Sequence, residues 1–191
     1  MQRTILQASR SRTLVGGPSF TLGNRVQRVI WNAVWTVFAA WTPPLLHPWR
    51  RFLLRLFGAR VAARCDVRGS ARVWLPANLE LAEGAMLAER VNCYNMAMVS
   101  LDEDALVSQG AYLCAGNHDI DDADFQLVAR PIHIGARCWV ASEAFVAPGV
   151  TLGEGSVLGA RAAAFGDLEP WMLYLGNPAL PKRPRKRPVD R

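Results

Sequence analysis

The sequence predicts an all-β core folded as a parallel β-helix, with a helical segment before it and a tail after it. From residue 61 onward an aliphatic residue returns every six positions, the fifth position of each unit is usually small, and glycine recurs at the second and fourth. An α-helix cannot produce this period, because six is not a multiple of about 3.6. A meander of hairpins would show a turn signal only about every eight to twelve residues. Short strands joined by tight turns, each sending one aliphatic side chain inward, explain the pattern.

The totals indicate a globular chain with an uneven charge distribution. It has 191 residues, of which 51% are apolar, enough for one core with appendages. Residues 1–60 contain nine arginines and no acidic residue, residues 182–191 are also basic, and the stretch between them is acidic overall. Basic ends favour a phosphate-bearing ligand, acidic lipid headgroups or nucleic acid as partner, with solvated tails as an equal alternative. The repeat has no basic face interleaved with aromatic residues, so we expect no nucleic acid.

The cysteines indicate a reducing compartment. They form no C-x-x-C pair, and the first residues lack the apolar core of a signal peptide. We expect reduced, mostly buried thiols in a cytoplasmic protein. The residues concerned are Cys65, Cys93, Cys114 and Cys138.

Two amphipathic helices are expected in the N-terminal segment, 1–60. Asn24 is expected to cap the first, and the prolines at 43 and 44 end it. The second runs over residues 47–57, with Pro48 in its first turn and Gly58 at its C-terminal side. Each carries an apolar stripe. The first stripe comprises Val26, Val29, Ile30, Ala33, Val34, Val37, Phe38 and Trp41; the second comprises Trp49, Phe52, Leu53, Leu56 and Phe57.

The helical segment can be placed in two ways. The apolar stretch 29–46 includes polar residues and two prolines, so it does not qualify as a transmembrane span. Residues 24–57 can pack on the body or on a neighbouring subunit. They can also lie peripherally at the inner face of the cell membrane, because Trp31 and Trp35 lie off the main stripe among arginines.

The repeat occupies residues 61–170, with an excursion at 119–133, and residues 171–191 form a C-terminal cap and basic tail. Stability accumulates as coils stack, and the open ends need caps. The side chains predicted to point inward are Val61, Val67, Val73, Leu81, Leu87, Cys93, Leu101, Val107, Leu113, Ile134, Val140, Val146, Leu152 and Leu158.

The hexapeptides resemble those of the left-handed β-helix acyltransferases, whose repeat runs aliphatic–Gly–x–x–small–x. A "GNHD" loop, a "CWVA" coil and a "GNPA" end follow in this order, and the chain resembles the colanic acid acetyltransferase (WcaF-like) branch over residues 22–185. The left hand is implied by the resemblance alone. The resemblance also implies an acetyl-CoA-dependent O-acetyltransferase. Such an enzyme works as a homotrimer with active sites between subunits, and it acts on a sugar of an exopolysaccharide or surface polysaccharide.

His118 is the predicted general base. A sugar hydroxyl is a weak nucleophile at neutral pH, and histidine, with an ordinary pKa of about 6.5, is well matched to deprotonate it. His118 ends a hexapeptide, opens the 119–133 excursion, and aligns with the histidine of the family. The alternative is a loop histidine without a task.

Metal and covalent catalysis are not expected. A related metal-dependent branch of this architecture uses three histidines, whereas this chain has only His47, His118 and His133, of which His47 is in the helical segment. His133 alternates with core-facing isoleucines, so it should point outward. Cys114 could carry an acyl group, but it occupies a small structural slot and direct transfer needs no such intermediate.

The resemblance implies further binding residues. Asn95, Tyr94 and Asp119 would contact the acceptor sugar. The remaining loop acids, such as Asp121, are expected to shape the loop or bind sugar. The pantetheine arm of acetyl-CoA would lie against small residues and one flat aromatic wall, and basic residues would meet its phosphates. These residues are Trp139, Ala141, Ser142, Gly159, Ala160, Lys182 and Arg183.

The chain departs from the family in one place. Many relatives have a Thr-Lys pair after the last coil, where this sequence has Phe165 and Gly166. Arg161, Lys182 or Arg183 would then supply the positive charge, or affinity for the donor is lower. The competing functional hypothesis is a noncatalytic trimeric assembly module recruited to the membrane surface. The sequence leaves the acceptor sugar, its hydroxyl and the length of the acyl group open.

Overall fold

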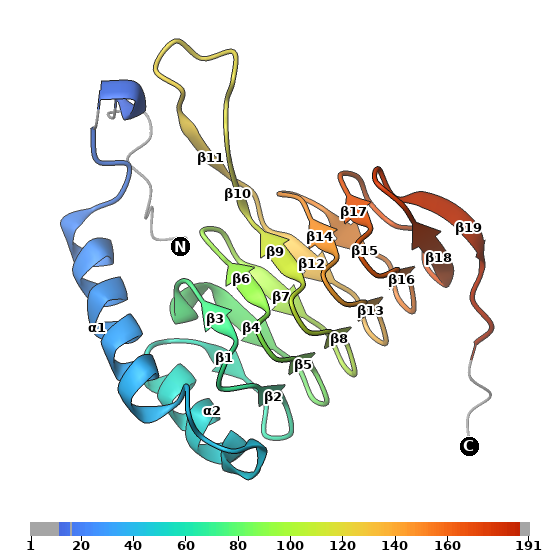
Figure 1. Cartoon of the computed structure of the whole chain (residues 1–191), viewed down its shortest axis with the longest axis horizontal. Coiled ribbons are helices and arrows are strands. Elements are labelled where there is room, and N and C mark those ends of the chain that lie inside the picture. The colour runs from blue at the N-terminus through green and yellow to red at the C-terminus, as the bar shows by residue number, and fades with distance from the viewer. Residues whose placement is uncertain (1–11, 16, 188–191) are drawn as a thin grey trace.

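The chain winds as a three-sided solenoid whose faces are parallel β-sheets (Figure 1). The coordinates are a computed structural model and describe residues 12–15 and 17–187. Each coil contributes one short strand to each face in turn. The first face consists of β1 (Arg60–Val61), β4 (Leu79–Leu81), β7 (Val99–Leu101), β12 (Ile132–Ile134) and β15 (Thr151–Leu152).

The other two faces follow the same rule. The second face consists of β2 (Asp66–Val67), β5 (Met86–Leu87), β8 (Leu106–Val107), β13 (Trp139–Val140), β16 (Val157–Leu158), β18 (Met172–Leu175) and β19 (Leu180–Pro184). The third face consists of β3 (Arg72–Val73), β6 (Asn92–Tyr94), β9 (Tyr112–Cys114), β14 (Phe145–Val146) and β17 (Ala163–Ala164). All neighbouring strands of these faces are parallel except the terminal pair β18–β19.

The interior confirms the period of six. Every side chain predicted to point inward is at most 7% exposed, from Val61 in the first coil to Leu158 in the fifth. They stack in columns along the solenoid: on the first face Leu81 aligns with Leu101, which aligns with Ile134. Each coil buries its aliphatic residues only against its neighbours, so the core is continuous along the axis.

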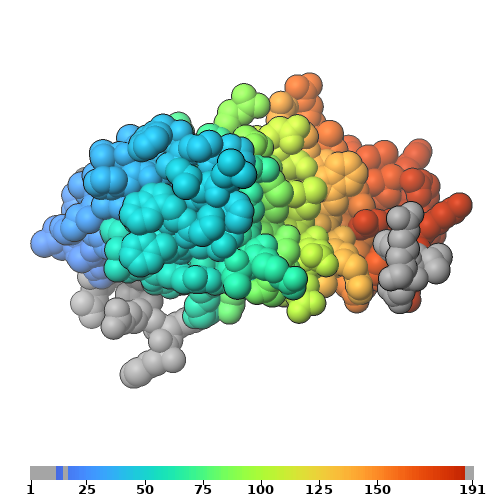
Figure 2. Space-filling view, turned by 90° about the horizontal axis from the view of Figure 1, so that it is seen from below, coloured from blue at the N-terminus to red at the C-terminus, as the bar shows by residue number. Residues whose placement is uncertain are grey.

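Two helices cover the N-terminal end of the solenoid (Figures 1 and 2). α1 spans Leu22–Phe38 and α2 spans His47–Leu56. Short 3-10 turns precede them at Thr13–Val15 and Pro44–Leu46, and a third lies at Pro76–Asn78. None of the helices in the described part of the chain is long and apolar enough to cross a membrane.

Side-chain donors on the helices satisfy the carbonyl groups of the first coil, which has no coil before it. The indole Nε1 of Trp31 donates to Val73 O at 2.7 Å, and that of Trp35 donates to Gly69 O at 3.0 Å. Arginines of α2 do the same for other carbonyls of this coil. Unpaired strand edges are sites of aggregation, so this end is blocked chemically as well as sterically.

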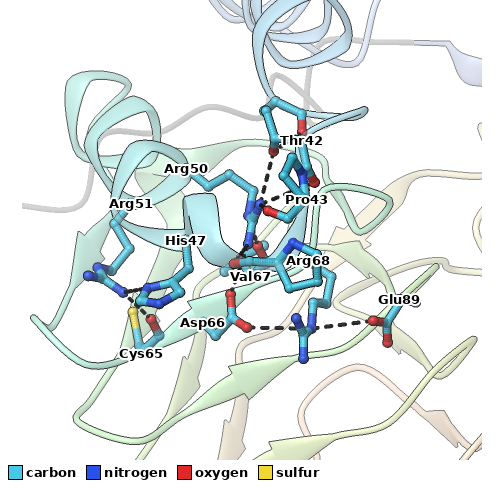
Figure 3. Close-up of polar contacts among 12 residues, drawn as sticks. Thr42, Pro43, His47, Arg50, Arg51, Cys65, Asp66, Val67, Arg68 and Glu89 are labelled. Carbon is cyan, nitrogen blue, oxygen red and sulfur yellow. Dashed lines mark hydrogen bonds and ion pairs between the residues drawn. The ribbon is translucent and has the colours of Figure 1, made fainter.

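Arg50 is the centre of this cap (Figure 3). Its side chain is fully buried, and its Nε donates to Val67 O at 2.6 Å. Its Nη1 donates to Thr42 Oγ1 and Pro43 O, and its Nη2 donates to Pro44 O and lies 3.4 Å from Asp66 Oδ1. Part of the N-terminal positive charge therefore has a structural task that the charge count alone does not reveal.

The sides of the helices that meet the solenoid are not their apolar stripes, and the prediction that Asn24 caps α1 is wrong. Trp31 and Trp35 are buried, whereas stripe residues such as Val29 are exposed. In α2 the buried side chains are Arg50, Leu53 and Leu54, so Leu53 is the buried member of the predicted stripe. The reason is that the solenoid edge requires N–H donors, which tryptophan and arginine supply and aliphatic residues lack.

The start of α1 also differs from the expectation. Thr21 caps this helix, with its hydroxyl accepting from Asn24 N at 3.2 Å. Asn24 itself is buried, and its Oδ1 accepts from Arg28 Nε at 3.0 Å. Gly58, at φ +93°, follows α2 as predicted.

The strands β18 and β19 close the C-terminal end. β18 continues the second face in parallel, and β19 returns antiparallel to it, beyond the last coil (Figure 1). Arg185 then donates to Arg137 O and Gly155 O at 2.8 and 2.9 Å, and its guanidinium lies 5.7 Å from the Trp171 ring centroid. The basic tail is thus partly built into the cap.

Candidate active site

The predicted loop is a hairpin that leaves the solenoid between its third and first faces. It contains β10 (Gly116–His118) and β11 (Leu127–Ala129), which pair antiparallel with His118 opposite Leu127, and it stands out from the body (Figure 1). A Cβ atom at Gly116 would overlap the terminal methyl of the buried Met96, so a larger residue here would require Met96 to move. His118 is therefore held by strand pairing and not by a loose loop.

The hairpin fixes the tautomer of His118. Its Nδ1 lies 2.9 Å from Phe125 O, and since a carbonyl oxygen only accepts, Nδ1 carries the proton. The imidazole also stacks on the Phe125 ring, at 4.4 Å between centroids and 11° between planes. Nε2 then holds the lone pair, and no residue in the described ranges donates to it. A neutral histidine oriented in this way is prepared to accept a proton at Nε2.

His118 opens into a hollow of about 390 Å³. Asp119 and Phe165 line this hollow, as does Arg130, the one cation among its described lining residues. The Phe165 side chain is 62% exposed. Phe165 and Arg130 were not assigned to the acceptor side from the sequence, because the hollow forms from segments that are distant along the chain.

The loop acids shape the hairpin tip. Asp119 Oδ1 accepts from Asp121 N at 3.1 Å, and Asp122 Oδ1 accepts from Asp124 N at 2.8 Å. These are local turns that aspartate favours. Asp119 lines the hollow with its side chain exposed, and its sugar contact stays a prediction.

The predicted sugar contact of Asn95 is wrong for this protomer. Asn95 is fully buried, and its side-chain amide exchanges two hydrogen bonds with the backbone of Leu75, at 3.0 and 2.7 Å. It joins adjacent coils, and neither polar group faces solvent. Tyr94 is half-buried on the third face, and burial raises the pKa of its phenol. It packs edge-on against Trp74 and Tyr112, at 5.7 and 6.4 Å between centroids.

The residues predicted to bind the donor cluster around the second face. Trp139 is 44% exposed on β13, and its Nε1 donates to Ser108 Oγ at 2.8 Å, which fixes the ring against the sheet. Ala141, Ser142 and Ala160 lie at the turns between the second and third faces. Ala141 is buried, Ser142 is half-buried and Ala160 is exposed. A Cβ at Gly159 would overlap Leu175, so this glycine also has a packing requirement.

Strand register aligns Arg183 with Trp139. Trp139 pairs with Val157, Val157 with Leu173, and Leu173 with Arg183, so the four lie in one row across the second face. Three strand spacings separate the ends of the row, a distance of about 14 Å. Lys182 lies at the irregularity beside this row. Arg161 is paired with Glu143 at 2.6 Å, so its charge is already partnered.

Within one protomer, His118 and the predicted donor residues lie at different corners. The hairpin connects the third face to the first, whereas the turns carrying Ser142 and Ala160 connect the second face to the third. The width of the third face separates them. A single protomer therefore does not bring the predicted base and the predicted donor groove together.

A second histidine forms a polar array on the first face. His133 points outward as predicted; its Nδ1 lies 2.9 Å from Ser100 Oγ, and its Nε2 lies 3.1 Å from Asp102 Oδ2. This array lines an open hollow of about 720 Å³. Both ring nitrogens of His133 have partners, whereas Nε2 of His118 does not have one in the described part of the chain. His118 is the better placed base.

The cysteines are free thiols on or inside the solenoid. Burial raises the pKa of Cys93 to about 12 and also raises the pKa values of Cys65 and Cys138. Cys114 donates to Gly116 O at 3.1 Å. No cluster of three or more His, Cys, Asp or Glu side chains suited to a metal ion occurs in residues 12–15 and 17–187.

The chain is similar over most of its length to proteins named as acetyltransferases. WcaF of Escherichia coli (strain K12), named as a colanic acid biosynthesis acetyltransferase, is 40% identical over 166 residues, which cover 87% of this chain and 91% of WcaF. The protein of that name in Shigella flexneri matches to the same extent. No protein-family model matches the chain.

Solved structures show the same fold. A maltose O-acetyltransferase from Clostridium difficile 630 has a TM-score of 0.78 at 18% identity, covering 87% of this chain and 90% of that chain. A hexapeptide-repeat acetyltransferase from Vibrio cholerae O1 biovar eltor, complexed with acetyl coenzyme A, has a TM-score of 0.76 at 18% identity, covering 87% and 91%. The predicted fold, a left-handed parallel β-helix, is confirmed.

Proposed function

Because the chain belongs to the colanic acid acetyltransferase family of hexapeptide-repeat enzymes, we propose that it transfers an acetyl group from acetyl-CoA to a sugar hydroxyl. The product would enter an exopolysaccharide or surface polysaccharide, as the name of the 40% identical relative suggests. Structures of this fold have been solved with acetyl-CoA and with CoA. The observation that carries the proposal is the His118 imidazole, which lines the hollow and whose Nδ1 lies 2.9 Å from Phe125 O, so that Nε2 is left to act as the base.

The proposed reaction needs one base and no covalent enzyme intermediate. Nε2 of His118 removes the proton from the sugar hydroxyl as its oxygen attacks the thioester carbonyl. The tetrahedral adduct collapses, the C–S bond breaks, and the proton on Nε2 passes to the leaving thiolate. The products are the O-acetyl sugar and free CoA, and the histidine returns to its starting form.

A panel assay tests the reaction class. The purified chain is incubated with acetyl-CoA and, separately, with a nucleotide sugar, a lipid-linked oligosaccharide and a free glycan, and thiol release is measured. We expect acceptor-dependent release with at least one, and a higher melting temperature with acetyl-CoA. If no acceptor causes thiol release and acetyl-CoA does not raise the melting temperature, the alternative of a noncatalytic assembly module is favoured.

The proposed assembly is a homotrimer whose sites lie between subunits. Three parallel solenoids in a closed ring bring the His118 corner of one copy to the donor corner of the next if their third faces point to the centre. The third face suits this position, because it carries a ladder of aromatic side chains. Successive rings lie 5.5 to 6.4 Å apart between centroids. The ladder consists of Trp74, Tyr94, Tyr112, Phe145 and Phe165.

A charge placed in the aromatic ladder should break the trimer. Phe145→Arg puts a guanidinium among rings that the proposed interface excludes from water, and we expect association to weaken at least about thirtyfold. Sedimentation measures the molecular mass of the assembly. Acetyl transfer should fall together with this mass, because each proposed site is formed by two subunits. Thr151→Arg, on the exposed first face, is the matched control. An unchanged trimer in Phe145→Arg would contradict the proposed face while leaving the reaction intact.

Arg183 is proposed to hold the phosphates of the donor. It lies in the row of Trp139 and is exposed, and Arg183→Ala should raise KM for acetyl-CoA about three- to tenfold with kcat nearly unchanged. The effect of Lys182→Ala should be smaller, because Lys182 lies beside the row. Steady-state kinetics measures both. Lys186→Ala, also exposed on the tail, controls for general loss of charge, and an equal effect there would argue against a specific contact.

A further inference from the structure

The helix pair and the turn between its helices present a surface that carries most of the exposed large apolar side chains of the described residues. We call this surface the outer helix face. Its side chains are between 39% and 85% exposed, and they belong to α1, α2 and the turn between them, at the N-terminal end of the molecule (Figure 2). A group of exposed apolar side chains that adjoin one another is typical of an interaction site. The outer helix face consists of Leu22, Val26, Val29, Ile30, Val37, Phe38, Trp41, Leu45, Leu46, Trp49, Phe52 and Leu56.

The outer helix face is not needed to hold the helices on the solenoid. Trp31 and Trp35 bind the first coil through their indole N–H groups, and Leu53 and Leu54 are buried beneath α2. On α1 the buried tryptophans and exposed residues such as Ala33 lie on opposite sides of one helix. The helix is therefore apolar on both sides, and among the described residues only its inner side is packed against the rest of the chain.

The charges on the segment that carries the outer helix face are all positive. Residues 12–59 contain no aspartate or glutamate, and Arg25 and Arg55 are exposed beside the apolar side chains. The guanidinium of Arg55 donates to the carbonyls of Val61 and Ala62, which leaves its charge uncompensated. An apolar face flanked by arginine is typical of helices that lie in the interface of an anionic bilayer.

Charge also disfavours a second copy as the occupant. Two outer helix faces brought together would place arginines against arginines, with no acid on either segment to pair with them. The tryptophans suit a lipid surface: the Nε1 groups of Trp41 and Trp49 donate to Val37 O and Phe38 O, at 2.7 and 2.8 Å. Their rings can therefore enter the headgroup region without an unsatisfied donor.

We propose that the outer helix face docks on an anionic lipid surface and places the N-terminal end of the solenoid against it. The docking is peripheral, with the apolar side chains at the boundary of headgroups and acyl chains and the arginines among lipid phosphates. It goes beyond acetyl transfer and does not depend on it. In the proposed trimer of parallel solenoids, all three outer helix faces would lie at the same end, so binding would gain from avidity.

Vesicle flotation of the full chain tests the proposal. We expect flotation with vesicles that contain phosphatidylglycerol, little with pure phosphatidylcholine, and a decrease as salt is raised. The double variant Ile30→Ser with Phe52→Ser removes apolar surface without changing charge. Its affinity for the anionic vesicles should be lower by about tenfold or more. Leu180→Ser removes a similarly exposed side chain at the opposite end and should float like wild type.

Two results would overturn the docking proposal. One is a wild-type chain that fails to float with anionic vesicles. The other is a double variant that floats as well as wild type. If the double variant instead lowers the molecular mass in sedimentation and wild type does not float, the occupant is a second copy. Acetyl transfer to a soluble acceptor, measured in parallel, should persist in the double variant, so failure of docking is distinguishable from failure of the proposed reaction.

Discussion

His118→Ala should lower kcat/KM for acetyl transfer by about 10² to 10⁴-fold, the usual contribution of a positioned general base. The fold should not change, because the imidazole lies on the hairpin and the solenoid core contains none of its atoms. Thiol release from acetyl-CoA in the presence of an acceptor measures the effect. Sedimentation and the melting temperature show whether the protein remains assembled.

His133→Ala is the matched control for His118. His133 is an outward-facing histidine on the same coil boundary, but both of its ring nitrogens are occupied by Ser100 and Asp102. We expect His133→Ala to retain acetyl transfer. If His133→Ala abolishes transfer and His118→Ala does not, the base is on the first face and the proposed site is wrong.

Arg50→Ala should lower the free energy of unfolding by about 3–5 kcal/mol. The substitution leaves the carbonyls of Val67, Pro43 and Pro44 without their donor and removes one of the two arginine partners of Asp66, the other being Arg68. It also creates a cavity between α2 and the first coil. Urea unfolding followed by circular dichroism measures the change, provided that the transition remains two-state.

Arg64→Ala is the control for Arg50. Arg64 pairs with Glu83 at 2.9 Å, but its side chain is 84% exposed, so we expect no measurable change in stability. Arg50→Lys keeps the charge but cannot reach all of the same acceptors, so its stability should lie between those of wild type and Arg50→Ala. A stability of Arg50→Ala equal to that of wild type would show that water replaces the guanidinium and that the cap does not depend on it.

The predicted excursion from the repeat is confirmed, because its sequence signal was local. The change from regular hexapeptides to "GNHD" predicted that His118 opens an excursion, and the structure has a hairpin there. Its role as the base stays a prediction, as do the donor contacts of Trp139 and Arg183 and the division of the chain at residues 60 and 170. Asn95 was misassigned because its partner is the backbone of Leu75, one coil away, and no local pattern reports such a contact.

The sequence by itself determined the solenoid, because each coil repeats the same local choice: an aliphatic side chain inward every sixth residue and a small residue at each turn. Only the tertiary structure decided which face of each helix is buried, because that depended on carbonyls of the first coil that need N–H donors from Trp31, Trp35 and Arg50. It also decided that His118 and the residues predicted to bind the donor occupy different corners of the solenoid. Such relations join segments that are distant along the chain, so hydrophobic periodicity carries no information about them.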